Sequence, residues 1–247
     1  MAEKTFAELL EETTEQSRLM DAPLNARLKA VADEVARLSP EFAGAVGRMV
    51  ARLEANQVGE NAPKTGEPMP DFILPDEKGA LVRLGALLEQ GPVVVSFNRG
   101  HWCPYCKLNA DGLAQIAPEI ARLGGQIVAI SPETHQYSAV LRDYAEAPFP
   151  VLADLDNGYA LTLGLVFWVG DEKREAMKAG GFDISLYNGN DTWMLPVPAT
   201  FVVGQDGLVK ARYIDPDYRR RMELDAIVEA VAAESGTEFE RRRRAAT

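Results

Sequence analysis

The chain has 247 residues, of which 47% are hydrophobic and 26% charged, as in a globular protein with one large core or with one core and an extension. Its 26 basic and 37 acidic residues give a formal charge of −11, which argues against nucleic acid and anionic membranes as partners, because both need a positive protein face. The first residues contain no apolar leader, and no apolar run reaches the roughly 20 residues that span a bilayer. We therefore expect a cytoplasmic protein that does not bind membranes.

The first part of the chain is predicted to be helical. Apolar residues such as Leu28, Val31 and Val35 recur at helical spacing up to about residue 58. Ser39 and Pro40 indicate a helix start, with Ser39 as the N-cap. We interpret residues 1–60 as a helical extension without chemistry of its own, which packs on the main domain or on a second copy of the chain.

From about residue 61, strands and helices alternate. Residues 57–70 are a linker rich in turn-forming residues, and residues 165–195 are predicted to be an irregular insertion. The order of elements predicts an α/β fold with a mixed central sheet flanked by helices. The domain would cover residues 61–235, followed by a basic tail at 236–247 with four consecutive arginines. Strands are expected at 71–74, 93–97, 126–131, 150–153, 199–203 and 208–213, and helices at 103–123, 134–147, 159–163 and 216–233.

The only two cysteines, Cys103 and Cys106, stand three residues apart directly after an apolar strand. At the start of a helix this spacing places both sulfurs on one face, and the helix dipole favours a thiolate at Cys103. Pro104 would occupy the first helical position and leave the N–H groups of Tyr105 and Cys106 free to point at the sulfur. The pair predicts dithiol redox chemistry, with Cys103 as an ionised, accessible nucleophile and Cys106 as the resolving thiol.

Two other uses of the cysteines are less favoured. A structural disulfide would close a very small loop and stabilise the fold little. A structural zinc site needs four ligands, and the chain offers two cysteines and two histidines. We expect no metal and no bound cofactor, because the electrons cycle through the two sulfurs.

Several segments carry a family resemblance. Residues 102–107, Trp-Cys-Pro-Tyr-Cys-Lys, resemble the active-site region of the thioredoxin superfamily. Residues 70–76, 128–131, 149–154 and 200–207 resemble the alkyl hydroperoxide reductase/thiol-specific antioxidant (AhpC/TSA) group, the peroxiredoxins and their relatives. The resemblance covers about residues 68–233 and implies a thioredoxin-like fold. It further implies that Pro198 follows a cis peptide bond and lies against the dithiol, and that Trp102 shields the thiolate.

The chain also departs from the typical peroxiredoxin pattern. Ser96 and Gly100 stand where that family has a proline and a threonine or serine, and Pro198 stands where it has an arginine. Arg99 or His101, which flank the site, is expected to replace part of this peroxide-activating set. The candidate catalytic residues are Cys103, Cys106, Arg99 and Pro198, and the candidate substrate-binding residues are Trp102, His101, Gly100 and Val197.

The resemblance implies an antioxidant oxidoreductase that reduces hydroperoxides through a dithiol–disulfide cycle, with a thioredoxin- or glutathione-type reductant and a homodimeric assembly. Two alternatives stay open. The replaced residues fit a thioredoxin-like thiol–disulfide oxidoreductase without peroxidase activity. A redox sensor is also possible, in which oxidation alters the 165–195 segment or the N-terminal helices.

Overall fold

The computed structural model describes residues 4–236, so the predicted basic tail lies outside the described residues apart from Gly236. Three helices open the chain. Ser39 Oγ accepts a hydrogen bond from the N–H of Phe42 at 3.3 Å, and Pro40 occupies the first turn of the third helix, as predicted. The three are α1 (Phe6–Arg18), α2 (Leu24–Leu38) and α3 (Pro40–Ala55).

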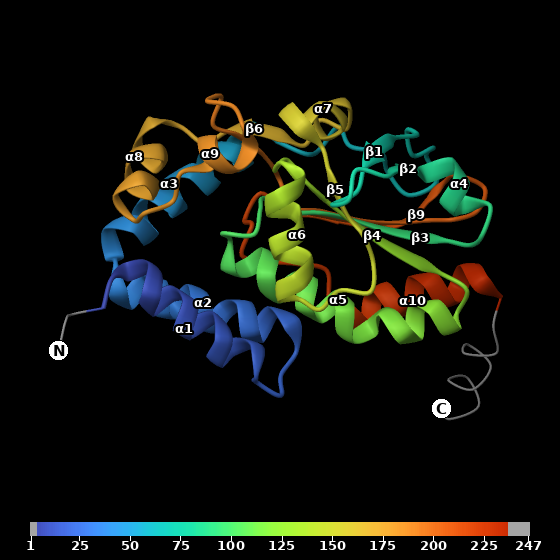
Figure 1. Cartoon of the computed structure of the whole chain (residues 1–247), viewed down its shortest axis with the longest axis horizontal. Helices are drawn as coiled ribbons and strands as arrows, with labels where there is room; N and C mark the ends of the chain where they lie inside the picture. The colour runs from blue at the N-terminus through green and yellow to red at the C-terminus, as the bar shows by residue number, and fades with distance from the viewer. Residues whose placement is uncertain (1–3, 237–247) are drawn as a thin grey trace.

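A five-stranded mixed sheet lies at the centre of the molecule, in the order β5-β4-β3-β8-β9 (Figure 1). The central strand, β3, pairs in parallel with β4 and antiparallel with β8. All five of its residues are buried, which explains its continuous apolar sequence. The strands are β3 (Val93–Phe97), β4 (Gln126–Ser131), β5 (Val151–Ala153), β8 (Ala199–Val203) and β9 (Val209–Ile214).

Helices cover both faces of this sheet, which confirms the predicted architecture. Val94 packs with α5 (Pro104–Arg122), α6 (His135–Tyr144) and α10 (Leu224–Ser235). Its neighbours Val93 and Val95 point to the opposite face, because successive side chains of a strand alternate. That face packs against α4, α7 and the segment around β1. The remaining small elements are β1 (Ile73–Pro75), β2 (Leu81–Arg83), α4 (Leu84–Leu88), η1 (Leu155–Asn157) and α7 (Gly158–Thr162).

The N-terminal helices pack on the body of the same chain. Helices α1 and α2 lie against α5, where Asp111 accepts hydrogen bonds from Arg18 Nε at 2.8 Å and from Arg27 Nη1 at 3.3 Å. Arg27 and Asp111 are both buried, so this ion pair is shielded from water. The helices thereby bring α3 to the end of the sheet that carries the two cysteines (Figure 1).

The expectation that residues 165–195 are irregular was wrong. Strands β6 (Val166–Trp168) and β7 (Met194–Pro196) pair antiparallel, and helices α8 (Asp171–Ala179) and α9 (Ile184–Asn188) lie between them. Helix α8 has only nine residues, most of them charged, so it shows no apolar periodicity. It buries Met177 and Lys173 and packs against α3.

The last helix begins later than predicted, at Leu224 rather than near residue 216. Residues 215–223 form a loop instead, because carboxylates there bond to nearby backbone. Asp215 Oδ1 accepts from the N–H of Asp217 at 2.8 Å, and Asp217 Oδ1 accepts from the N–H of Arg219 at 3.2 Å. Such local hydrogen bonds compete with a helix.

Candidate active site

The site forms where β3 ends and α5 begins. Cys103 is the N-cap residue of α5, and Pro104 occupies the first helical position, as the sequence predicts. Arg99, on the loop between the two elements, contacts both sulfurs. Its Nη2 donates to Cys103 Sγ at 3.1 Å, and its backbone N–H donates to Cys106 Sγ at 3.3 Å. Both cysteines are free thiols and fully buried, and Arg99 is only 3% exposed.

This arrangement gives the two cysteines opposite protonation states. Burial alone would raise the pKa of Cys103, but the hydrogen bond from Cys106 and the charge of Arg99 outweigh it and hold that pKa well below the ordinary value. Burial and the bond to the Cys103 thiolate together raise the pKa of Cys106 well above the ordinary value. The site therefore holds a thiolate next to a thiol, as a nucleophile and its resolving partner require.

Aromatic rings fix the guanidinium of Arg99. Its Cζ lies 3.4 Å from the centroid of the Tyr218 ring and 5.1 Å from that of Trp102. Tyr218 in turn meets Tyr105 edge to face, with centroids 5.4 Å apart. Trp102, which the family resemblance implies to be a shield of the thiolate, thus lies against the cation that binds the thiolate.

Arg221 is a second cation near the dithiol, and the sequence analysis missed it. Its Nη2 lies 3.7 Å from Cys106 Sγ, and Nη1 donates to the carbonyl oxygens of Tyr218 and Arg220. The side chain is 2% exposed and makes no ion pair with a carboxylate within residues 4–236. The Oδ1 atom of Asn25 accepts from its backbone N–H at 2.9 Å, so α2 helps to position it. Its separation of 115 residues from Cys106 left no local sequence signal.

The backbone N–H groups at the start of α5 do not donate hydrogen bonds to Cys103 Sγ, contrary to the prediction. The N–H of Cys106 donates to the carbonyl oxygen of Cys103 at 3.0 Å, and the side chain of Cys103 accepts no hydrogen bond from the helix backbone. The prediction that the N–H groups of Tyr105 and Cys106 point at Cys103 Sγ was wrong, because Cys103 makes no side-chain cap and the N–H of Cys106 binds its carbonyl oxygen instead. The guanidinium of Arg99 takes the place of those amides.

Gly100 and His101 face a buried carboxylate instead of the sulfurs. Glu133, fully buried, accepts from the N–H of His101 at 2.8 Å and lies 2.7 Å from its Nδ1. Gly100 has φ = +141°, and a Cβ there would lie 2.5 Å from Trp102 Nε1 and 2.6 Å from Glu133 Oε1. Only glycine fits this position, so both residues shape the loop that carries Arg99.

The prediction of a cis peptide bond before Pro198 was wrong, since no peptide bond within residues 4–236 is cis. The trans form is the default for X–Pro bonds. Val197 follows β7 and directly precedes Pro198. Its N–H donates to the carbonyl oxygen of Leu165 at 2.7 Å, which fixes the start of β8. Both residues are buried, and Val197 belongs to the same apolar cluster as the two cysteines.

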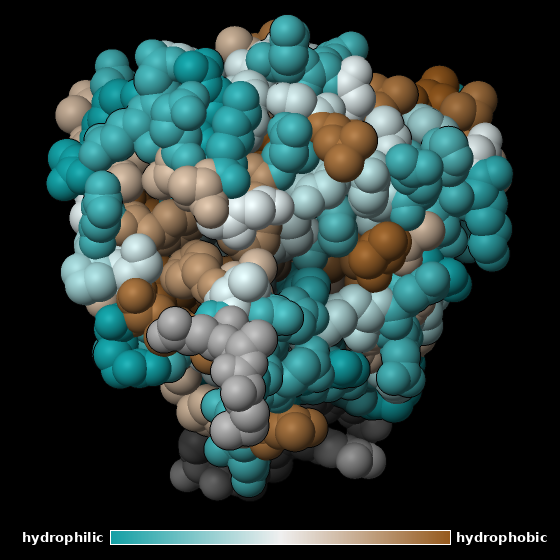
Figure 2. Space-filling view, turned by 60° about the vertical axis from the view of Figure 1, so that its left-hand side comes forward, coloured by the Kyte–Doolittle hydropathy of each residue, from teal (hydrophilic) through white to brown (hydrophobic). Residues whose placement is uncertain are grey.

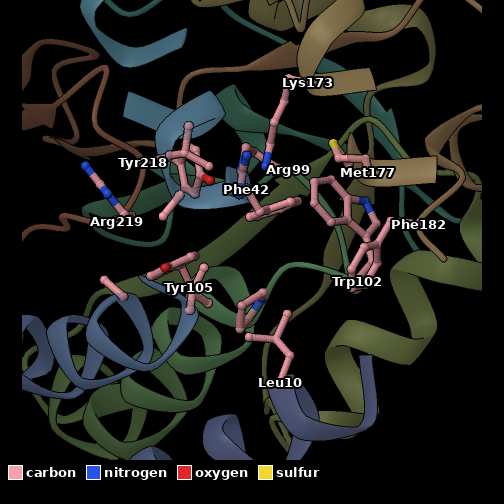
Figure 3. A pocket seen from close by; sticks show the side chains of 15 residues that line it. Leu10, Phe42, Arg99, Trp102, Tyr105, Lys173, Met177, Phe182, Tyr218 and Arg219 are labelled. Carbon is pink, nitrogen blue, oxygen red and sulfur yellow. The ribbon is translucent and has the colours of Figure 1, made fainter. Parts of the chain in front are cut away.

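A cavity lies directly over the site (Figure 3). Arg99, Trp102, Tyr105 and Tyr218 form its floor, while α1, α2, α3 and α8 supply the remaining walls. Neither sulfur lines it. The expectation of an accessible Cys103 is therefore wrong for this closed arrangement, in which aromatic rings and Arg99 separate the thiolate from the cavity.

No group of three or more His, Cys, Asp or Glu side chains within residues 4–236 is arranged to hold a metal ion. Within the same residues, no helix is both long and apolar enough to cross a membrane.

Known proteins named as peroxiredoxins are similar to this chain over part of its length. The Mycobacterium tuberculosis (strain H37Rv) protein named "Putative peroxiredoxin Rv1608c" is 32% identical over 102 residues, which are 41% of this chain and 66% of the relative, just under two thirds of its length. Peroxiredoxin bcp1 of Schizosaccharomyces pombe is 26% identical over 141 residues, 55% of this chain and 70% of the relative.

A solved structure with a similar fold is that of peroxidoxin BcpB from Mycobacterium tuberculosis. It has a TM-score of 0.54 and 24% identity, and the match covers 69% of this chain and 97% of that one. The model of the AhpC/TSA family matches residues 65–212, more than half of the chain. This segment contains the complete sheet except its last two residues, together with Arg99 and both cysteines. The chain therefore belongs to the AhpC/TSA family.

Proposed function

We propose that the protein is a thiol-based antioxidant oxidoreductase that reduces hydroperoxides through a cycle of Cys103 and Cys106. The observation that supports this most is the pair of opposite protonation states: Arg99 Nη2 at 3.1 Å holds Cys103 as a thiolate, while Cys106 keeps its proton. Relatives named as peroxiredoxins support the same reaction.

The reaction begins with the attack of the Cys103 thiolate on the terminal oxygen of a hydroperoxide. The O–O bond breaks, the sulfur becomes a sulfenic acid, and the alkoxide takes up a proton and leaves as an alcohol. The thiol of Cys106 then attacks the sulfenic sulfur, which forms the disulfide and releases water. A thioredoxin- or glutathione-type reductant supplies two electrons and two protons to restore both thiols.

Access to the site requires movement. Both sulfurs are buried beneath Arg99 and the rings of Trp102 and Tyr218. A hydroperoxide needs only a small opening to reach Cys103, whereas a thioredoxin-type reductant reaches the disulfide only after a larger opening of the cavity. The proposal also includes a cytoplasmic location and a homodimer. It further divides the chain into a helical extension and a thioredoxin-like domain.

Single-turnover stopped-flow kinetics test it. The reduced protein should consume hydrogen peroxide or an organic hydroperoxide far faster than a free thiol does. Cys103→Ser should abolish the reaction, and Cys106→Ser should leave a sulfenic acid that persists or overoxidises. A wild-type rate equal to that of free thiol, together with rapid reduction of insulin, would instead establish the thioredoxin-like alternative.

A further inference from the structure

Lys173, on helix α8, is a buried lysine without a hydrogen-bond partner among residues 4–236. The residue is 3% exposed, and its Nζ makes no hydrogen bond with this part of the chain. Its Nζ lies over the ring of Phe42, 3.1 Å from the centroid. Figure 3 shows the side chain reaching from α8 into the cavity over the dithiol, toward Phe42 and Arg99. A buried amine without a partner is costly, which points to a ligand that this arrangement lacks.

The cavity is lined by three basic side chains, those of Arg99, Lys173 and Arg219, and by no carboxylate. Arg99 faces the single thiolate of Cys103, and Arg221, behind the site, makes no ion pair with a carboxylate within residues 4–236. Arg219 also lines the cavity and is already paired with Asp217 at 2.7 Å. An anion in the cavity would find positive charge and no competing carboxylate.

The walls around these charges are apolar. Leu10, Val35 and Val46, from α1, α2 and α3, line the cavity together with Met177 from α8. The first three belong to helices that lie outside the family match at residues 65–212. The chain has thus added an apolar roof to the family's fold, directly over the dithiol.

We propose that this cavity binds an apolar ligand that carries a single carboxylate, with Lys173 as the counter-ion of that carboxylate. Arg99 already binds the Cys103 thiolate and Arg219 is paired with Asp217, so Lys173 is the lining cation without an anionic partner among residues 4–236. A single unengaged amine suits a monoanion better than a phosphate, which needs several donors. Where the ligand is the hydroperoxide itself, the inference rests on the proposed function; binding of the carboxylate does not depend on it.

Room for the apolar part of the ligand lies next to the cavity. The cavity itself is narrow, about 40 Å³, which suits a carboxylate group better than a whole chain. A wider groove of about 610 Å³ adjoins it, and Phe42 lines both. The groove runs between α1, α3 and α8, and Figure 2 shows apolar side chains gathered in a hollow on this side of the molecule. Glu41, Glu172 and Glu175 also line the groove, so the carboxylate of the ligand would lie in the cavity and only its apolar part in the groove.

Binding should be coupled to uptake of a proton. Burial, aided by the charge of Arg99, lowers the pKa of Lys173 to about 6, so its amine is neutral at pH 8. A carboxylate at Nζ would favour the ammonium form. The titratable and charged groups that face the amine from the packed elements are Arg99, Cys103, Tyr105, Tyr218 and Arg219. The Cys103 thiolate is the one anion among them, and it is engaged by Arg99.

Isothermal titration calorimetry of the reduced full chain tests the proposal. The probes are butanoate, octanoate and dodecanoate, with methyl octanoate as the neutral comparison. At least one carboxylate should bind, and at pH 8 its binding should take up close to one proton, measured in buffers of different ionisation enthalpy. Lys173→Met should weaken binding at least tenfold and abolish proton uptake. Lys178→Met, at an exposed lysine of the same helix, should change neither.

Three results would overturn the proposal: no carboxylate binds, methyl octanoate binds as tightly as octanoate, or Lys173→Met keeps the proton uptake. Kinetics then show whether the ligand is the hydroperoxide substrate or a carboxylic acid that does not react. If it is the substrate, Lys173→Met lowers kcat/KM at least tenfold more for a carboxylated organic hydroperoxide than for its methyl ester. If it is a non-oxidising acid, octanoate changes the rate of the reaction with hydrogen peroxide. Absence of any peroxidase activity with intact carboxylate binding would remove the proposed function alone.

Discussion

The guanidinium of Arg99 lies 3.1 Å from the sulfur of Cys103, and neither side chain is open to solvent. Each charge is stable in this dry setting because the other is present. The pair also explains why the pKa of Cys103 is lowered although burial works in the opposite direction. The reactivity of the dithiol should therefore depend on Arg99 more than on the start of helix α5.

Replacement of Arg99 should make Cys103 an ordinary buried thiol. Without the cation, the pKa of Cys103 should rise, and a lost charge-assisted hydrogen bond of about 1.5–3 kcal/mol lowers the rate at pH 7 by about tenfold to a hundredfold. We expect this for Arg99→Met in stopped-flow oxidation and in alkylation by iodoacetamide. Arg99→Lys should recover part of the rate, because it keeps a charge but loses the planar fork.

The matched control is Arg48→Met, which removes a surface guanidinium paired with Glu172. It should react as the wild type does. If Arg99→Met retained the wild-type pH profile, the role given to this cation would be wrong.

Arg221 should act on the resolving step as a positioning residue. It lies 3.7 Å from Cys106 Sγ, and its charge lowers the pKa of that thiol. Arg221→Gln should slow disulfide formation roughly tenfold and move its pH profile upward, since one pKa unit corresponds to about 1.4 kcal/mol. Trapping of the sulfenic acid with dimedone, followed by mass spectrometry, measures its lifetime. A merely structural role would lower stability and leave the pH profile where it is.

Gly100→Ala should destabilise the loop that carries Arg99. The substitution meets a left-handed backbone at φ = +141° and clashes with Trp102 and Glu133, so we expect a loss of about 2–5 kcal/mol. Gly66 has φ = +89° with nothing within 4 Å, and Gly66→Ala should cost only about 1–2 kcal/mol. Urea unfolding of both variants gives the comparison. Equal losses would show that the clash is relieved by movement of the loop.

Lys173→Met should stabilise the protein without ligand. The pKa of Lys173 is lowered from its ordinary value of 10.5 to about 6, so between these values the unfolded chain binds more protons and the free energy of unfolding rises with pH. The variant removes this penalty and should be more stable by roughly 3–5 kcal/mol at pH 7. Its advantage should shrink by about 1.4 kcal/mol per unit as the pH rises toward 10.5.

Thermal or urea unfolding at several pH values measures this difference. Lys178→Met, at an exposed position, should leave stability nearly unchanged. A destabilised Lys173→Met variant would mean that the amine has a partner in the folded protein.

The sheet was predictable mainly because β3, β4, β5 and β8 are short and largely apolar. The expected and observed limits of β3, residues 93–97, coincide. The region from 165 to 195 was not predictable, because most residues of α8 are charged and the helix owes its place to packing against α3. That packing buries Lys173, which in the sequence resembles any solvated helix residue.

The site, like the fold, has residues that the sequence predicted and residues that it did not. Cys103, Cys106 and Arg99 are neighbours along the chain, so local spacing identified them. Arg221 and Tyr218 come from a loop more than a hundred residues later, and only the fold brings them to the sulfurs. The cis peptide bond before Pro198 was expected only from the family resemblance, and the structure shows that this bond is not cis.

Titration of the Cys103 thiolate tests the central claim most directly. Its ultraviolet absorbance is followed against pH in the reduced Cys106→Ala variant, which has no donor at this position, and in the wild type, with Cys103→Ser as the blank. We predict that Cys103 in the wild type ionises well below the ordinary thiol pKa of about 8.5, and that loss of the Cys106 hydrogen bond raises its pKa in the variant. A wild-type midpoint near 8.5 or higher would contradict the account, because burial would then have prevailed over Arg99.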